Sequence, residues 1–172
     1  GKIPQLGERF QHKKLQFSFG MPPAEEQRLV ARFVPQGNGY VLADGWKEVG
    51  GADLCFYYEV NAHYADLLEE ETTELFIRLT HEVYRERLGE YFGDTIRGVF
   101  TDEPQLNTFG LPWSFCLCEE FLKRNGYDLL SRLWLLAADG EGCEALRHDF
   151  WDTVNDLFLH RFTEKIYRWC EE

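Results

Sequence analysis

Two adjacent carboxylates, Asp102 and Glu103, stand where an apolar segment of the chain ends. The stretch TIRGVFTDEP runs from that segment, Ile96 to Phe100, into the two acids and then into Pro104. This pattern predicts a buried strand that Pro104 ends, because proline cannot donate to a strand ladder. A carboxyl that is partly desolvated at such a strand end can hold a raised pKa and donate a proton to a leaving oxygen. We therefore expect a general acid here; the alternative is a structural pair that caps the next segment or binds an arginine.

The elements that would position this acid pair are a helix and a second strand that precede it. The continuous apolar and aromatic run Leu54–Val60 is typical of a strand buried on both faces. After it, Phe76, Leu79 and Val83 recur at the three- and four-residue spacing of one helix face. Strand, helix and strand together predict a right-handed βαβ unit with parallel strands, whose carboxyl ends are where ligands bind. The predicted fold class is therefore α/β.

Further elements are indicated on both sides of this unit. The turn cluster PQGNG separates two short β-type runs, Leu29–Val34 and Tyr40–Ala43, which predicts a β-hairpin within residues 28–44. Two more helices are expected, from about Ser114 to Gly126 and from Glu141 to Glu172. The last helix carries a wide apolar stripe, so we expect it to pack against a sheet or a subunit partner.

The length and composition favour a single domain. A chain of 172 residues with 44% hydrophobic content can bury one sizeable core. We therefore expect one α/β domain over residues 1–172. Within it, the hairpin of residues 28–44 is an insertion, and residues 53–172 form the βαβα portion.

Charge and hydropathy narrow the possible partners. The chain has 30 acidic and 18 basic residues, a formal net charge of -12, which repels a phosphate backbone, so nucleic acid is not an expected partner. No window reaches the roughly 18 apolar residues of a membrane span. The start GKIPQLGERF lacks the apolar core of a signal peptide. We expect no membrane partner and a cytoplasmic location.

The residues that could hold a metal give a weaker signal. The five cysteines show no C-x-x-C spacing, which argues against a zinc site or a disulfide scaffold and favours a reducing compartment. Asp102 and Glu103 offer the oxygen ligands that Ca²⁺ takes, although the chain has no Asp-x-Asp-x-Asp-Gly loop. We expect no cofactor, with Ca²⁺ at the acid pair as the alternative.

Three longer segments resemble a known enzyme family. They are HYADLLEEETTELFIRLTHEVYRERLGEYFGDTIRGVFTDEPQ, PWSFCLCEEFLKRNGYDLLSRL and RHDFWDTVNDLFLHRFTEKIYRWC. Together they resemble the catalytic-barrel portion of large bacterial glycoside hydrolases, namely the α-L-rhamnosidase-like group and its uncharacterised relatives. The motifs that carry the resemblance are Tyr64, Asp66, Leu67 and Leu68; Thr80, His81 and Glu82; Asp102 and Glu103; and Arg124, Gly126, Tyr127 and Asp128, with Asn125 as an extra residue after Arg124.

The resemblance implies part of a (β/α)8 barrel, with the hairpin as an insertion and long C-terminal helices. Because that fold takes around 250 residues, we expect the chain to be a fragment of a longer enzyme, or to cover its apolar faces with a second copy. The implied activity is cleavage of O-glycosidic bonds in plant or bacterial oligo- and polysaccharides, α-L-rhamnosides among them. The rival interpretation is a non-catalytic sugar-binding or structural module that is inactive in isolation.

The resemblance also implies roles for individual residues. Glu103 is the expected general acid, with Asp102 beside it. Glycoside hydrolysis needs a second carboxyl across the scissile bond, and this would be Glu59 or a residue outside the chain. Aromatic rings near the strand ends can stack on sugar faces. The expected substrate-binding residues are Glu59, Asn61, His63, Tyr64, Gln105 and Trp113.

Overall fold

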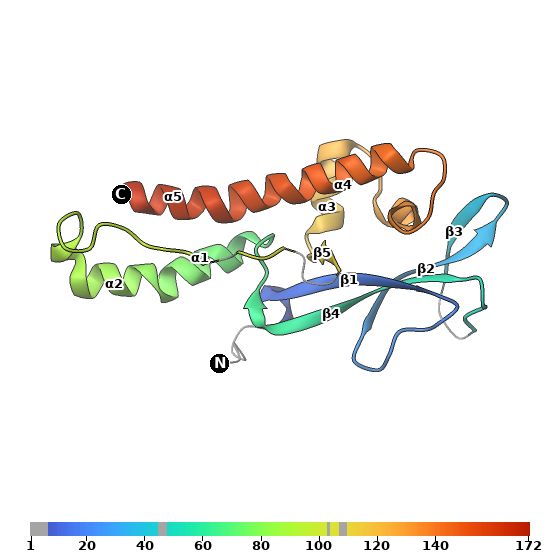
Figure 1. Ribbon diagram of the computed structural model, residues 1–172, viewed down its shortest axis with the longest axis horizontal. Helices are drawn as coiled ribbons and strands as arrows, with labels where there is room; N and C mark the ends of the chain where they lie inside the picture. Colours follow the sequence, from blue (N-terminus) through green and yellow to red (C-terminus); the bar gives the residue numbers. More distant parts are fainter. Residues whose placement is uncertain (1–6, 45–47, 103, 107–109) are drawn as a thin grey trace.

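The computed structural model describes residues 7–44, 48–102, 104–106 and 110–172. Its strands form one five-stranded sheet in the order β3-β2-β4-β1-β5, and each neighbouring pair of strands is antiparallel (Figure 1). The strands are β1 (Gln11–Phe19), β2 (Arg28–Gln36), β3 (Gly39–Ala43), β4 (Leu54–Ala65) and β5 (Leu111–Trp113).

The hydrophobic core lies between one face of this sheet and the helices that cover it (Figure 1). Alternate residues of a strand point to the same face, so Leu15 of β1 and Phe56 of β4 both reach the core, and both are fully buried. The helices close the core with apolar side chains at helical spacing. These are Leu117 and Phe121 of α3 together with Leu146, Phe150, Val154 and Leu157 of α4.

The helices fall into two groups along the chain. The first follows β4 and the second follows β5, and the last helical segments form one long rod across the molecule (Figure 1). A single π turn, Leu159–Thr163, joins α4 to α5 within that rod. The α-helices are α1 (Glu70–Leu79), α2 (His81–Leu88), α3 (Leu117–Asn125), α4 (Cys143–Phe158) and α5 (Glu164–Glu171), and short 3₁₀ turns occupy Glu8–Phe10, Gly89–Tyr91 and Leu130–Leu136.

The helix predicted around Phe76, Leu79 and Val83 is present, but it breaks at Thr80. The backbone of Thr80 has φ -120° and ψ -73°, outside the helical region, and α2 begins at the next residue. The Thr80 hydroxyl donates to the carbonyl of Phe76 at 2.6 Å. Such back-bonding competes with the backbone ladder and often bends helices, and here it accompanies the break between α1 and α2.

The predicted parallel βαβ unit is wrong. Residues 97–100 are irregular, Ile96 forms no more than an isolated bridge with Phe92, and Phe100 is 87% exposed. The run Leu54–Val60 does form a strand within β4, but its neighbours β1 and β2 are both antiparallel to it. A central antiparallel strand covered by helices is as apolar as a parallel one, so composition could not distinguish them. The partial (β/α)8 barrel is therefore not the fold of this chain.

The predicted hairpin is confirmed, although it is not an insertion. β2 and β3 pair from Gln36 opposite Gly39 to Arg32 opposite Ala43. Gly37 has a φ of 59°, a left-handed conformation that the tight turn requires and that glycine adopts without steric cost. β2 also pairs with β4, so the hairpin belongs to the main sheet.

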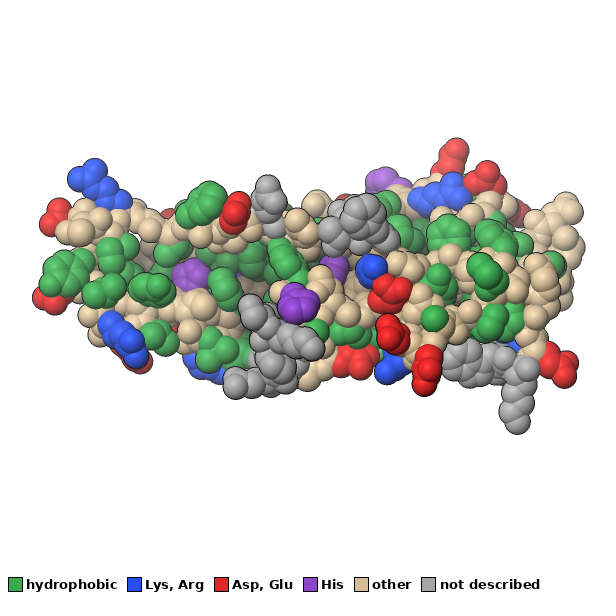
Figure 2. Space-filling model, turned by 60° about the horizontal axis from the view of Figure 1, so that its bottom comes forward, with side chains coloured by type: hydrophobic (Ala, Val, Ile, Leu, Met, Phe, Trp, Pro, Cys, Tyr) green, Lys and Arg blue, Asp and Glu red, His purple; other side chains and the backbone are tan. Residues whose placement is uncertain are grey.

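Apolar side chains remain exposed where α1, α2 and α5 extend beyond the sheet. Figure 2 shows hydrophobic side chains spread over this half of the molecule. Leu79 is 59% exposed and Tyr84 is 61% exposed. Of the predicted last helix, Leu146, Phe150, Val154, Leu157 and Phe162 are buried, Trp151 and Leu159 are exposed, and α5 contributes no buried residue. The buried face of α4 thus belongs to the core that it shares with α3 and the sheet.

Candidate functional site

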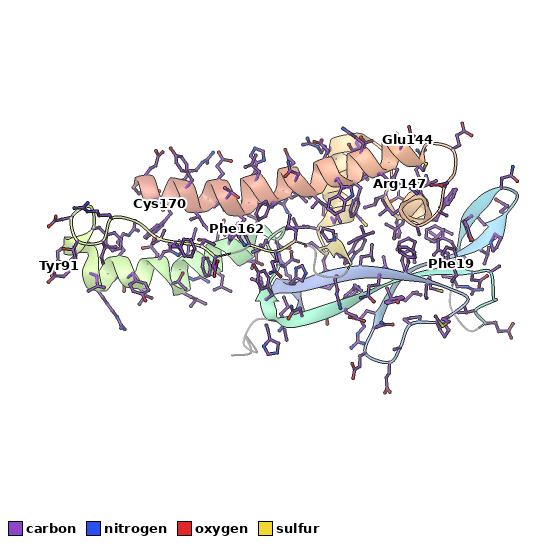
Figure 3. The ribbon with its side chains drawn as sticks, in the orientation of Figure 1. Phe19, Tyr91, Glu144, Arg147, Phe162 and Cys170 are labelled. Atoms are coloured by element: carbon purple, nitrogen blue, oxygen red, sulfur yellow. The ribbon has the colours of Figure 1, made fainter. Side chains whose placement is uncertain are left out.

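A cavity of about 350 Å³ lies between the end of β4, the helices α1 and α2, and the irregular segment around Asp102. Its volume falls in the range of small-molecule sites. Phe162 closes it from above, and Figure 3 shows this side chain pointing from the long C-terminal rod toward α1. The residues that β4 and α1 contribute to the lining are His63, Tyr64, Ala65, Thr72, Thr73 and Phe76.

A buried ion pair fixes the chain where β4 turns into α1, between the lining residues Ala65 and Leu67. Lys13 is fully buried, and its ammonium lies 3.1 Å from Oδ2 of Asp66. It also donates to the carbonyls of Arg9 and Gln11. The other Asp66 oxygen, Oδ1, accepts from the backbone N–H of Leu68 at 3.1 Å. Burial raises the pKa of Asp66, while Lys13 opposes that shift.

A hydrogen bond brings the Asp102 segment to the end of β4. The backbone N–H of Gln105 donates to the hydroxyl of Tyr64 at 2.8 Å. Three residues before Gln105, Asp102 lines the cavity together with Tyr64 and His63. Residues almost 40 positions apart in the chain therefore meet around one cavity, even though the strand expected to join them does not form.

Two buried threonines form the polar part of the α1 wall. Thr72 is 2% exposed and Thr73 is 1% exposed. Neither hydroxyl oxygen has a hydrogen-bond partner among the described residues. Buried polar side chains are usually bonded, so two neighbouring exceptions on one cavity wall call for an explanation.

His81 closes the cavity at the break between the helices. Its ring is edge-on to the rings of Phe76 and Trp169, with centroids 5.2 and 4.8 Å away. Its Nδ1 lies 2.8 Å from the hydroxyl of Thr80. Burial lowers the pKa of His81, which favours the neutral ring. A neutral imidazole can accept or donate one hydrogen bond at each nitrogen, depending on its tautomer.

Of the predicted site residues, His63, Tyr64 and Asp102 lie on the cavity, and Gln105 is bonded to Tyr64. Glu103, the predicted general acid, lies outside the described residues. Asp102 is exposed, and it is the one acidic side chain among the described lining residues.

The other predicted site residues lie elsewhere. Glu59 is on β4, where Oε2 lies 2.8 Å from Lys14 Nζ and Oε1 accepts from the Gln27 amide. The bond from Lys14, followed by that from Gln27, lowers the pKa of Glu59. Trp113 is 6% exposed in the core, and the Asn61 side chain accepts from the backbone N–H of His63 at 3.0 Å. These three residues do not line the cavity.

A cluster of metal ligands and a membrane-spanning helix are two features that do not occur among the described residues. No group of three or more His, Cys, Asp or Glu side chains that could hold a metal ion occurs among them. Within the same part of the chain, no helix is long and apolar enough to cross a bilayer. The five cysteines are all free thiols.

No family model, no curated protein and no solved structure matches this chain. The resemblance to the α-L-rhamnosidase-like group therefore depends on the motifs themselves. The fold defines a cavity with aromatic walls and a few polar groups, of the size that small-molecule sites have.

Sequence reasoning missed the α1 wall of this site. Thr72 and Thr73 attract no attention in a sequence, because threonine hydroxyls in a helix usually bond to a preceding backbone carbonyl. One signal was present: two adjacent β-branched residues near the start of a helix are unfavourable for helix formation, so a role in packing or binding offsets that cost. His81 appeared in the Thr-His-Glu motif, but only the tertiary structure assigns it to the cavity.

Proposed function

We propose that the cavity binds a carbohydrate and that the chain contributes the proton donor of a glycoside hydrolase. The observation that supports this proposal is the meeting of His63, Tyr64 and Asp102 around one cavity. All three were expected at a sugar site on sequence grounds. Independently of that expectation, the cavity volume of about 350 Å³ is large enough for a small-molecule ligand.

The lining suits a sugar. A pyranose has apolar C–H faces that pack on aromatic rings and an edge of hydroxyls that needs hydrogen-bond partners. Tyr64, Phe76 and Phe100 provide rings on different sides of the cavity. His63 and Asp102 provide groups that bond hydroxyls.

The acid pair carries the proposed catalytic role. In the sequence, Glu103 stands between Asp102 and Pro104, and both of these neighbours line the cavity. Glycosidases require two carboxyls, about 5–5.5 Å apart for retention or about 6.5–9.5 Å apart for inversion. Because the pair must lie on opposite sides of the scissile bond, two adjacent acids are poorly suited to supply both. Glu59 cannot be the second carboxyl in this fold. It lies on β4, forms an ion pair with Lys14 of β1, and does not line the cavity. The second carboxyl is therefore proposed to come from another part of a longer enzyme.

A non-catalytic sugar-binding module is the second candidate. The observation that favours it is the presence of one acidic side chain among the described lining residues of the cavity. A module of this kind binds sugar with no second carboxyl, and its acids bond hydroxyls.

Glutamine substitution distinguishes the two candidates. Glu103→Gln keeps the shape of the side chain and removes its titrating proton, so the proposed enzyme should retain sugar binding and lose hydrolysis. Binding is measured by calorimetry with L-rhamnose, D-galactose and D-glucose, and hydrolysis with the aryl glycosides of the same sugars. Losing general acid catalysis should lower the rate about 10²–10⁴-fold, most strongly for poor leaving groups.

Glu59→Gln is the matched control, because it removes a carboxylate on the sheet and should leave both measurements unchanged. Hydrolysis is assayed in the longer enzyme that would supply the second carboxyl, and saturable binding by that enzyme with no hydrolysis above background would favour the module. If none of the three sugars binds saturably, both candidates are wrong.

A further inference from the structure

We infer that the hydroxyls of Thr72 and Thr73 are ligand-binding groups, which bond to neighbouring hydroxyls of the sugar in the cavity. The inference rests on the proposed function and adds the residues that recognise the ligand. Both side chains line the cavity, and both are at least 98% buried. Neither hydroxyl oxygen has a partner among the described residues.

One threonine at a helix end and one inside a helix show what the hydroxyl ordinarily does. The Thr80 hydroxyl donates to the carbonyl of Phe76, four residues earlier, at 2.6 Å. The Thr153 hydroxyl donates to the carbonyl of Asp149 at 2.7 Å and accepts from Asn125. Thr72 and Thr73 depart from this pattern, although they lie inside a helix as Thr153 does.

The carbonyls that would satisfy the two hydroxyls already accept other bonds. Four residues before Thr72, the carbonyl of Leu68 accepts from Arg161 at 3.0 Å and from the thiol of Cys116 at 3.5 Å. Four residues before Thr73, the carbonyl of Glu69 accepts the backbone N–H of Thr72 at 3.1 Å. Both hydroxyl oxygens are buried within the α1 wall, so a ligand in the cavity reaches them when χ1 turns the hydroxyl toward it.

A threonine in a helix has two accessible χ1 rotamers, so a rotation exchanges the positions of its methyl and hydroxyl groups. Each hydroxyl can donate one bond and accept others, as a sugar hydroxyl can. The remaining walls near them are apolar, with Leu67, Phe76 and Phe162. Two adjacent hydroxyls between apolar walls match a ligand with two neighbouring hydroxyls on one edge and a C–H face beside them. An apolar ligand would leave the threonine hydroxyls unpaired, and a charged one would find no counter-ion on this wall.

The unpaired state of these hydroxyls gives the inference a test that does not need the ligand. Valine has the shape of threonine without the hydroxyl. Removing a buried group that has no partner should stabilise the free protein, so Thr72→Val and Thr73→Val should each raise Tm by about 2–4 °C. Thr153→Val is the matched control, because Thr153 is equally buried but doubly bonded, and it should lower Tm.

The same variants should weaken binding. Each valine should raise the Kd of the sugar that the wild-type protein binds by about 10-fold, because one ligand hydroxyl loses its partner. Thr72→Ser and Thr73→Ser keep the hydroxyl and should retain most of the affinity. The probes are L-rhamnose, D-galactose and D-glucose, measured by calorimetry.

Two results overturn the inference while leaving the proposed function intact: valine variants that bind the sugar as tightly as wild type, or valine variants that lose stability as Thr153→Val does. Failure of the wild-type protein to bind any of the three sugars overturns the proposed function and, with it, this inference. Stabilised valine variants with weakened sugar binding support both.

Discussion

The hydroxyl of Tyr64 accepts a hydrogen bond from the backbone N–H of Gln105 at 2.8 Å. This contact joins the end of β4 to the segment that carries Asp102, so it brings two walls of the cavity together. The segment has few other means of support, because residues 97–102 belong to no helix or strand and Phe100 is largely exposed. Tyr64 thus takes part in the site in two ways, through its ring on the cavity and through its hydroxyl on the opposite wall.

Tyr64→Phe should loosen the Asp102 segment while leaving the fold in place. The ring remains, but the N–H of Gln105 loses its acceptor, which should cost about 0.5–1.5 kcal/mol. Amide hydrogen exchange of Gln105 should become faster, and exchange in the core strands should stay unchanged. Equal protection of Gln105 in the variant and the wild type would contradict the contact.

Lys13→Met should be strongly destabilising, because it leaves the Asp66 carboxylate buried without its cation. Breaking a buried ion pair on one side typically costs about 3–5 kcal/mol. The free energy of unfolding from urea titration measures the loss. Lys14→Met is the control: Lys14 pairs with Glu59 at the partly exposed surface, where a pair contributes about 0–1 kcal/mol.

The double variant Lys13→Met/Asp66→Asn should recover part of that loss, since no uncompensated charge remains. The coupling of the pair would be contradicted if the double variant lost as much free energy of unfolding as Lys13→Met and Asp66→Asn lose together.

Stability should fall as the pH drops below about 6.5, because two buried histidines have lowered pKa values. Burial, with Lys13 and Lys14 adding to it, lowers the pKa of His12 below 6.5, and burial lowers that of His81. The unfolded chain therefore takes up these protons first, so stability is fully present above pH 6.5 and is lost as the pH falls through the folded pKa values. Urea midpoints at pH 7.5 and 5.5 measure the loss.

Replacing His81 should flatten this dependence. His81→Phe keeps a ring against Phe76 and Trp169 but removes the titrating nitrogen, so the difference in midpoint between pH 7.5 and 5.5 should shrink. His148 is largely exposed, and His148→Gln should leave the difference unchanged. The same difference in His81→Phe and wild type would show that His81 does not contribute.

Local sequence patterns predicted most of the elements but not how they pair. The Gly-Asn turn predicted the β2–β3 hairpin, and Gly126 ends α3 with a φ of 77°, as a left-handed C-cap should. Strand β1 went unpredicted, although Leu15, Phe17 and Phe19 alternate as a half-buried strand requires. Without β1, the apolar run in β4 had no antiparallel partner and was assigned a parallel one.

Burial was the second property that local patterns could not supply. Lys13 is fully buried because Asp66, 53 residues away, pairs with it, and no local pattern indicates that contact. Phenylalanine is typical of buried strands, yet Phe100 is exposed. At the site, His63, Tyr64 and Asp102 could be named because polar residues next to apolar runs are conspicuous. Thr72 and Thr73 could not, since the missing partners of their hydroxyls are a property of the tertiary structure.

The most direct test of the central claim is a titration of the ¹⁵N- and methyl-labelled protein with L-rhamnose, D-galactose and D-glucose, followed by NMR. If the cavity binds a sugar, signals of His63, Tyr64, Thr72, Thr73 and Asp102 should shift together and saturate at one Kd. Signals of Glu59 on the sheet and Thr153 in α4 should stay in place. Saturating shifts confined to residues outside the cavity, or no shifts at all with the three sugars, would contradict the account.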